Sequence, residues 1–182
     1  MIIIKQYDGI NINDLTVLGQ GTQGTVYKID NEKCIKIFKK SKSCNDEINS
    51  LLLAQGNPFF PILYSYGKNY IVREYIDGLQ LDNYLLSNPF TPTLARGVIE
   101  LYEAMSYIGY TRLDCALFHI FITCTNEIKL IDTSKAMKEK KVYPYLIIKG
   151  LDSFGYKNQF LSLVKIIKPN IYNTWIKQKL FD

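Results

Sequence analysis

The chain has 182 residues, of which 47% are hydrophobic, and its formal net charge is +5. This composition is apolar enough for a core and excludes a disordered chain, while no apolar run approaches the about 20 residues of a membrane helix. Four cysteines without a C-x-x-C pair disfavour zinc and disulfides, and the N-terminus lacks a signal-peptide pattern, so we expect reduced thiols and a cytoplasmic protein.

The N-terminal part is predicted to be rich in strands. The segments expected as strands are 15–18, 25–29, 34–38, 62–66 and 70–75. A single helix is expected to begin at Ser43 or Asn45 and to end at Gln55, where Gly56 stops it. The apolar residues expected on one face of that helix are Ile48, Leu51 and Leu52.

The C-terminal part is predicted to be mainly helical. After a short helix at 81–87, a longer helix begins at Pro92, with Thr91 as its cap, and ends at Gly109. A hairpin is expected at 118–123 and 127–131, followed by more helix. The order predicts an α+β protein of two lobes within one domain, 1–182: a sheet lobe with one helix over 1–76 and a reduced helical lobe over 77–182.

Three glycines form the pattern G-x-G-x-x-G-x-V. Gly19, Gly21 and Gly24 are followed by Val26. Glycines allow a tight turn and a close approach of the backbone to phosphate oxygens. A β-branched segment follows, so a strand leaves the loop instead of the helix of a dinucleotide-binding fold. An ordinary glycine-rich hairpin fits the pattern alone equally well.

Two charged residues follow the loop. Lys36 alternates with isoleucines in the strand 34–38, and Glu47 lies in the next helix. Each residue taken alone is also typical of a solvated surface. Taken together, they fit a lysine that contacts the α- and β-phosphates of a nucleotide and a glutamate that holds the lysine by an ion pair.

The order of motifs resembles the protein kinase superfamily, and most of all small stand-alone bacterial serine/threonine protein kinase-like proteins. The resemblance extends over residues 15–136. The features that carry it are the glycine loop, Lys36, Glu47, the segment 71–78, Asp114 and Asp132. It implies an ATP-dependent phosphotransferase that uses Mg²⁺ or Mn²⁺ and a protein substrate.

The resemblance also implies roles for single residues. Asp114, with Lys36 and Glu47, would be catalytic, because a carboxylate there accepts the proton of the substrate hydroxyl. Asp132 would bridge the metal to the phosphates. The nucleotide-binding residues implied are Gly19, Gly21, Gly24, Val26, Lys36, and Glu74 and Ile76, whose backbone groups would meet the adenine, with Arg73 behind that site.

Several positions depart from the kinase pattern. His119 stands where a metal-binding asparagine is expected, and it could ligate metal, hydrogen-bond Asp114 or the phosphates, or simply pack in the fold. Thr133 and Ser134 replace the Phe-Gly after the metal-binding aspartate, which favours a fixed backbone over a switched one. Leu113 and Ala116 replace an arginine and a lysine, and only 50 residues follow Asp132, too few for a full helical lobe.

These departures leave three functions open: an active serine/threonine protein kinase, a pseudokinase that acts as a binding module, and a small-molecule phosphotransferase of the aminoglycoside or choline kinase kind. Residues 135–182 contain ten lysines and three acidic residues, a net charge of +7. This basic third could bind an acidic partner or form a solvated lysine face; the sequence does not favour nucleic acid as a partner.

Overall fold

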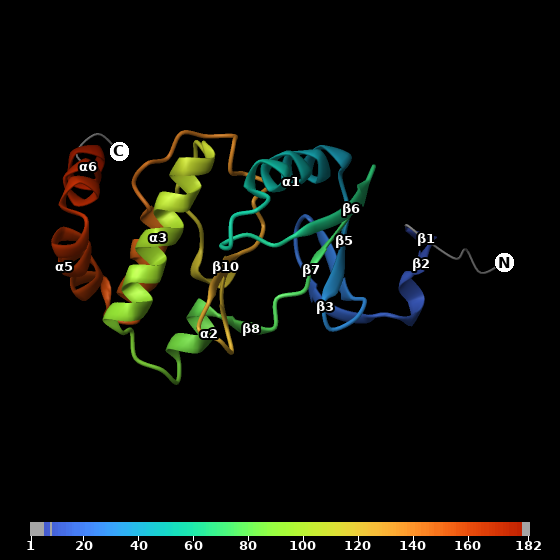
Figure 1. The fold of residues 1–182 in the computed structure, drawn as a ribbon, viewed down its shortest axis with the longest axis horizontal. Coiled ribbons are helices and arrows are strands. Elements are labelled where there is room, and N and C mark those ends of the chain that lie inside the picture. Colours follow the sequence, from blue (N-terminus) through green and yellow to red (C-terminus); the bar gives the residue numbers. More distant parts are fainter. Residues whose placement is uncertain (1–5, 8, 180–182) are drawn as a thin grey trace. The chain divides into compact units, whose positions relative to one another are not determined.

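The computed structural model describes residues 6–7 and 9–179. The chain forms two compact units (Figure 1). The sheet unit comprises the chain up to Asp77 together with 132–134, and the helical unit comprises 78–131 and the chain from Lys135. Strands and helices are both abundant, so the predicted α+β class is confirmed.

The sheet unit is built on an antiparallel sheet of five strands in the order β3-β4-β5-β7-β6. A separate two-stranded ladder, β1-β2, and a 3₁₀ helix, η1, precede it. The helix α1 contacts β5, β6 and β7. The bounds are β1 Gln6–Tyr7, β2 Ile10–Asn11, η1 Ile12–Asp14, β3 Thr16–Gln20, β4 Gly24–Lys28, β5 Lys33–Phe38, α1 Ser41–Ala54, β6 Leu63–Gly67 and β7 Tyr70–Glu74.

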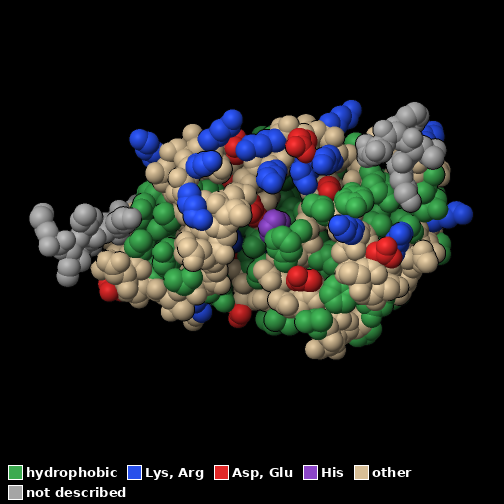
Figure 2. All heavy atoms as spheres, turned by 180° about the vertical axis from the view of Figure 1, so that it is seen from behind, with side chains coloured by type: hydrophobic (Ala, Val, Ile, Leu, Met, Phe, Trp, Pro, Cys, Tyr) green, Lys and Arg blue, Asp and Glu red, His purple; other side chains and the backbone are tan. Residues whose placement is uncertain are grey.

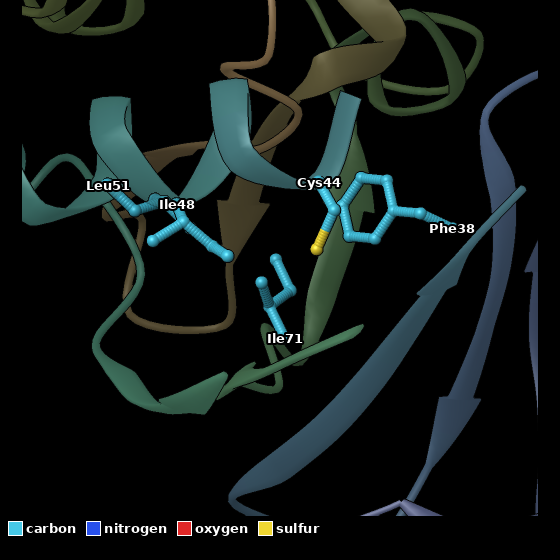
Figure 3. Close-up of a cluster of buried hydrophobic side chains, with 5 residues drawn as sticks. All are labelled: Phe38, Cys44, Ile48, Leu51 and Ile71. Carbon is cyan, nitrogen blue, oxygen red and sulfur yellow. The ribbon is translucent and has the colours of Figure 1, made fainter. Parts of the chain in front are cut away.

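The core of the sheet unit lies between α1 and the sheet. Its cluster of buried side chains consists of Phe38, Cys44, Ile48, Leu51 and Ile71 (Figure 3). The α1 members lie three and four residues apart, the spacing that puts side chains on one helical face. Leu52 is 48% exposed, so its predicted place on that face is wrong: it follows Leu51 by one residue, which turns it by about 100°.

The start of α1 also differs from the prediction. The helix begins at Ser41, after Lys40, so neither Ser43 nor Asn45 is its cap. Lys40 makes no side-chain capping hydrogen bond. The hydroxyl of Ser41 instead bonds Asn69 in the β6–β7 turn, which ties the first turn of α1 to the sheet.

The helical unit combines a small sheet with helices. Its strands form an antiparallel sheet in the order β10-β9-β8, and α5 contacts α3, α4 and α6. The bounds are β8 Gly78–Gln80, α2 Leu81–Leu85, α3 Pro92–Ile108, η2 Leu117–His119, β9 Ile120–Thr123, β10 Ile128–Leu130, α4 Tyr145–Ser153, α5 Lys157–Ile167 and α6 Pro169–Lys179. No helix of the described residues is long and apolar enough to cross a membrane.

The helix α3 has the ends that the sequence predicts. Thr91 Oγ1 accepts a hydrogen bond from Leu94 N at 3.2 Å, and Gly109 closes the helix with φ 90°, a left-handed conformation that suits glycine. The predicted hairpin is also present as β9–β10. The strand β8 was not predicted, and residues 118 and 119 belong to η2, not to a strand.

Candidate nucleotide-binding and catalytic residues

The glycine loop is the hairpin between β3 and β4. Gly21 N donates to Gly24 O at 2.9 Å, which closes the turn. A Cβ added to Gly24 would lie 2.0 Å from Ile37 O in the neighbouring strand β5, whereas Gly19 and Gly21 have no such neighbour within 4 Å. Gly24 is therefore required by strand packing, and the space at Gly19 and Gly21 is open to a ligand.

Lys36 and Glu47 form a buried ion pair. Lys36 in β5 is 7% exposed, Glu47 in α1 is 1% exposed, and Lys36 Nζ lies 2.6 Å from Glu47 Oε2. The register of β4 and β5 places Val26 opposite Lys36. Burial raises the pKa of Glu47, and the Lys36 charge opposes that rise. The sheet thus holds a cation beside the glycine hairpin and a carboxylate that orients it.

Asp132 belongs to the same unit. Its Oδ1 lies 3.5 Å from Lys36 Nζ and accepts a hydrogen bond from Ser134 Oγ at 2.9 Å. The next residue, Thr133, forms a hydroxyl–hydroxyl bond of 2.6 Å with Ser50 of α1. Asp132 has φ 58°, in the left-handed region that is uncommon for a residue with a side chain. These bonds hold the carboxylate beside the Lys36–Glu47 pair.

Gln23, at the tip of the glycine hairpin, also reaches Asp132. Its Nε2 donates to Asp132 Oδ1 at 3.3 Å and to Oδ2 at 3.4 Å. Gln23 Oε1 is buried and accepts no hydrogen bond within the described part of the chain. Carboxylate and amide oxygens are hard ligands, so this pair of residues fits a Mg²⁺ or Mn²⁺ ion. The sequence reasoning missed Gln23, because only its place in the glycine pattern marked it.

The backbone proposed to meet adenine is already hydrogen-bonded. Glu74 O accepts from Arg73 Nη1 at 3.0 Å and from Cys34 Sγ at 3.6 Å. Ile76 follows β7 and is buried. Arg73 is 5% exposed, and its Nε has no acceptor among the residues that the structure describes. An adenine amino group would therefore have to share the Glu74 carbonyl with a guanidinium.

Asp114 lies in the helical unit and is 6% exposed. Its Oδ1 accepts a 2.8 Å hydrogen bond from Leu146 N in the first turn of α4, and its Oδ2 lies 3.9 Å from Arg112 Nη2. Burial raises the pKa of Asp114; the Leu146 N–H and the Arg112 charge act in the opposite direction. The carboxylate is thus fixed in orientation by the start of α4.

His119 is the last residue of η2 and belongs to the helical unit. Its ring meets the Phe118 ring edge-on, with 4.4 Å between centroids, and its backbone O accepts from Ile131 N at 2.9 Å. Over residues 6–7 and 9–179, no group of three or more His, Cys, Asp and Glu residues could hold a metal ion.

The basic third of the chain carries exposed lysines, among them Lys135, Lys138, Lys140 and Lys141. Some charges in the helical unit are matched by nearby acids. Lys141 Nζ lies 3.4 Å from Glu139, and Lys168 Nζ lies 2.8 Å from Glu103. Figure 2 shows many blue basic side chains with red acidic ones among them.

Comparisons with known proteins define the fold. No family model and no curated protein matches the sequence. The structure is similar to the PknI kinase domain of Mycobacterium tuberculosis, with a TM-score of 0.52 and 17% sequence identity. The match covers 74% of this chain and 65% of that domain. The chain therefore has a two-lobe protein-kinase-like fold, with an antiparallel sheet lobe and a small, mainly helical lobe.

Proposed function

We propose that this protein is an ATP-dependent serine/threonine protein kinase that requires Mg²⁺ or Mn²⁺. The observation that carries the proposal is the buried Lys36–Glu47 pair of 2.6 Å, with Asp132 3.5 Å from the same lysine. A buried lysine needs a partner, and Glu47 and Asp132 hold this lysine in place beside the glycine hairpin, where it would bind an anion. A nucleotide phosphate is the anion that this fold and the adjacent glycine hairpin favour.

Each residue has a distinct part in the proposed reaction. Lys36 would bind phosphate oxygens, and Glu47 would keep the lysine in place. Asp132 would hold the divalent cation, which neutralises phosphate charge when it is bound. In the helical unit, Asp114 would orient the substrate hydroxyl and take its proton. The roles of Gly19 and Gly21 would be to let phosphate approach the backbone closely.

The substrate would be a serine or threonine hydroxyl of a protein in the cytoplasm. The net charge of +7 over 135–182 favours a substrate or docking partner with acidic residues, since opposite charges raise the association rate. Ion pairs such as Lys168–Glu103 neutralise part of this charge, so the attraction would rest on the remaining lysines.

A second candidate function is that of a pseudokinase, a binding module without phosphoryl transfer. The observation that favours it is the hydrogen bond from Arg73 to the Glu74 carbonyl, which occupies the acceptor proposed for adenine. The same arrangement would weaken nucleotide binding without disturbing the fold. Activity measurements separate the two functions.

The test is transfer of label from γ-³²P-ATP, with Mg²⁺ or Mn²⁺, to the protein itself and to generic basic and acidic protein substrates. Wild type is compared with Lys36→Ala and Asp114→Asn, each purified identically. We expect label in the wild type and a loss of about 100-fold or more in both variants. Equal label in all three proteins would show a contaminating kinase and refute the proposal, and no label in the wild type would also refute it and favour the pseudokinase.

A further inference from the structure

The side chain of Gln23 is placed by the backbone around it. Gln23 O accepts a hydrogen bond from Lys39 N at 2.8 Å, and Lys39 Nζ donates to Gly21 O at 3.0 Å. The hairpin tip is therefore tied to Lys39, the residue after β5, at both Gly21 and Gln23. This anchoring holds the carboxamide at the Asp132 carboxylate.

The hydrogen bonds between Gln23 and Asp132 are long. Gln23 Nε2 is shared between the two carboxylate oxygens at 3.3 and 3.4 Å, beyond the usual N–H···O distance of about 2.9–3.0 Å. At the same time Gln23 Oε1 is buried without a hydrogen-bond donor in the described part of the chain, which is unfavourable for an amide oxygen. The Gln23 amide beside the carboxylate thus has a nitrogen that makes only long hydrogen bonds and an oxygen that accepts none within the described part of the chain.

Rotation about the Cγ–Cδ bond exchanges these two ends at almost no change of shape. With Nε2 toward Asp132, the site suits the ligand-free carboxylate. With Oε1 toward Asp132, two kinds of hard oxygen face the same point, which suits a divalent cation. The orphaned oxygen is then explained, because it gains a partner when the ion arrives.

We propose that Gln23 Oε1 is a ligand of the divalent cation that Asp132 holds. The inference rests on the proposed nucleotide-dependent function and assigns a second protein ligand to its metal. Mg²⁺ and Mn²⁺ are commonly bound by one or two side-chain oxygens together with phosphate oxygens and water. An amide oxygen from the hairpin completes such a set without His119, whose imidazole is a softer ligand than Mg²⁺ prefers.

The proposal links the ion to the hairpin. Gln23 would exchange its N–H hydrogen bonds to Asp132 for an amide oxygen beside the same carboxylate, and Gln23 and Asp132 would together hold the ion.

The experiment measures Mn²⁺ binding by the full chain in the presence of saturating AMP-PNP, with the free Mn²⁺ signal in electron paramagnetic resonance as the readout. The variants are Gln23→Leu, which removes the oxygen at similar size, and Gln23→Glu, which keeps an oxygen. Gln20→Leu is the matched control, since it makes the same change at an exposed residue of the same hairpin. Thermal unfolding without ligand verifies that each variant is folded.

We expect Gln23→Leu to weaken Mn²⁺ binding about tenfold or more, Gln23→Glu to bind at least as tightly as wild type, and Gln20→Leu to be unchanged. Asp132→Asn should lose the site. If Asp132→Asn loses Mn²⁺ while Gln23→Leu binds like wild type or more tightly, Gln23 is no ligand and the proposed function stands. If Asp132→Asn also binds like wild type, or wild type binds no Mn²⁺ with AMP-PNP, both proposals fall.

Discussion

Replacing Gly24 by alanine should destabilise the sheet unit strongly, because β4 and β5 approach too closely for any side chain at this position. The added Cβ would lie 2.0 Å from Ile37 O, 2.9 Å from Ile37 C and 3.0 Å from Phe38 Cα. All three atoms are backbone, so no side-chain rotation relieves the overlap. To reach an ordinary contact of 3.4 Å, the strands would have to separate by about 1.4 Å.

The cost follows from this displacement. Overpacking a well-packed site costs about 1–3 kcal/mol when side chains can adjust. Here the backbone of a central strand has to move, so we expect a loss of about 3 kcal/mol. For a chain of this size each kcal/mol lowers the unfolding midpoint by roughly 2–4 °C, which gives a decrease of roughly 6–12 °C.

Gly19→Ala and Gly21→Ala are the matched controls in the same hairpin. Neither added Cβ has a neighbour within 4 Å, so thermal unfolding should change by less than about 2 °C. Both should nevertheless weaken binding of an ATP analogue, because their Cβ would occupy the space proposed for phosphate. Measured by circular dichroism, a Gly24→Ala midpoint equal to that of Gly21→Ala would refute the packing argument.

Two further predictions concern buried charges. Lys36→Met should lower the free energy of unfolding, measured in urea, by about 3–5 kcal/mol, because it leaves the Glu47 carboxylate buried without its cation. Adding Glu47→Gln should recover much of that loss. A double variant whose loss equals the sum of the two single losses would exclude coupling between the residues. Because burial raises the pKa of Asp114 above its ordinary 3.8, the folded protein binds this proton more tightly than the unfolded chain does. Wild type should therefore lose stability relative to Asp114→Asn as the pH rises from about 3.8 through the raised pKa, and level off above it; pH-dependent thermal unfolding showing the opposite trend would contradict this.

The parts of the fold that the sequence predicted well are those marked by residues within the element itself or next to it. The helix α3 has a capping threonine, a proline in its first turn and a terminal glycine, and all three act within a few residues. The strand β8 has no comparable signal, since it is three residues long and pairs with β9 more than 40 residues later. Gly78 marks it only in the structure, where an added Cβ would lie 2.5 Å from Ile122 O.

In the candidate site, too, some contacts could be expected from the sequence and others could not. The kinase resemblance singled out Lys36 and Glu47, and the structure places their charged atoms 2.6 Å apart. The bond from Gln23 to Asp132 joins residues 109 positions apart, and no spacing rule connects them. The Arg73–Glu74 bond was equally hidden, because side-chain direction in β7 decides whether the guanidinium turns back to its own strand.

In the proposed reaction the Asp114 carboxylate has two roles: one oxygen holds the group in its orientation, and the other accepts the proton of the substrate. Oδ1 accepts from Leu146 N, so α4 fixes the orientation of the group, and Oδ2 is the oxygen that would meet a substrate hydroxyl. Arg112 lies 3.9 Å from Oδ2, so it favours the charged form that a proton acceptor needs. Asparagine keeps an oxygen for the Leu146 N–H and removes the charge. The Asp114→Asn variant therefore tests the proton-accepting role of Oδ2 separately from the hydrogen bond to α4. If that variant folds like wild type and still transfers phosphate at the wild-type rate, Asp114 serves only to hold the start of α4.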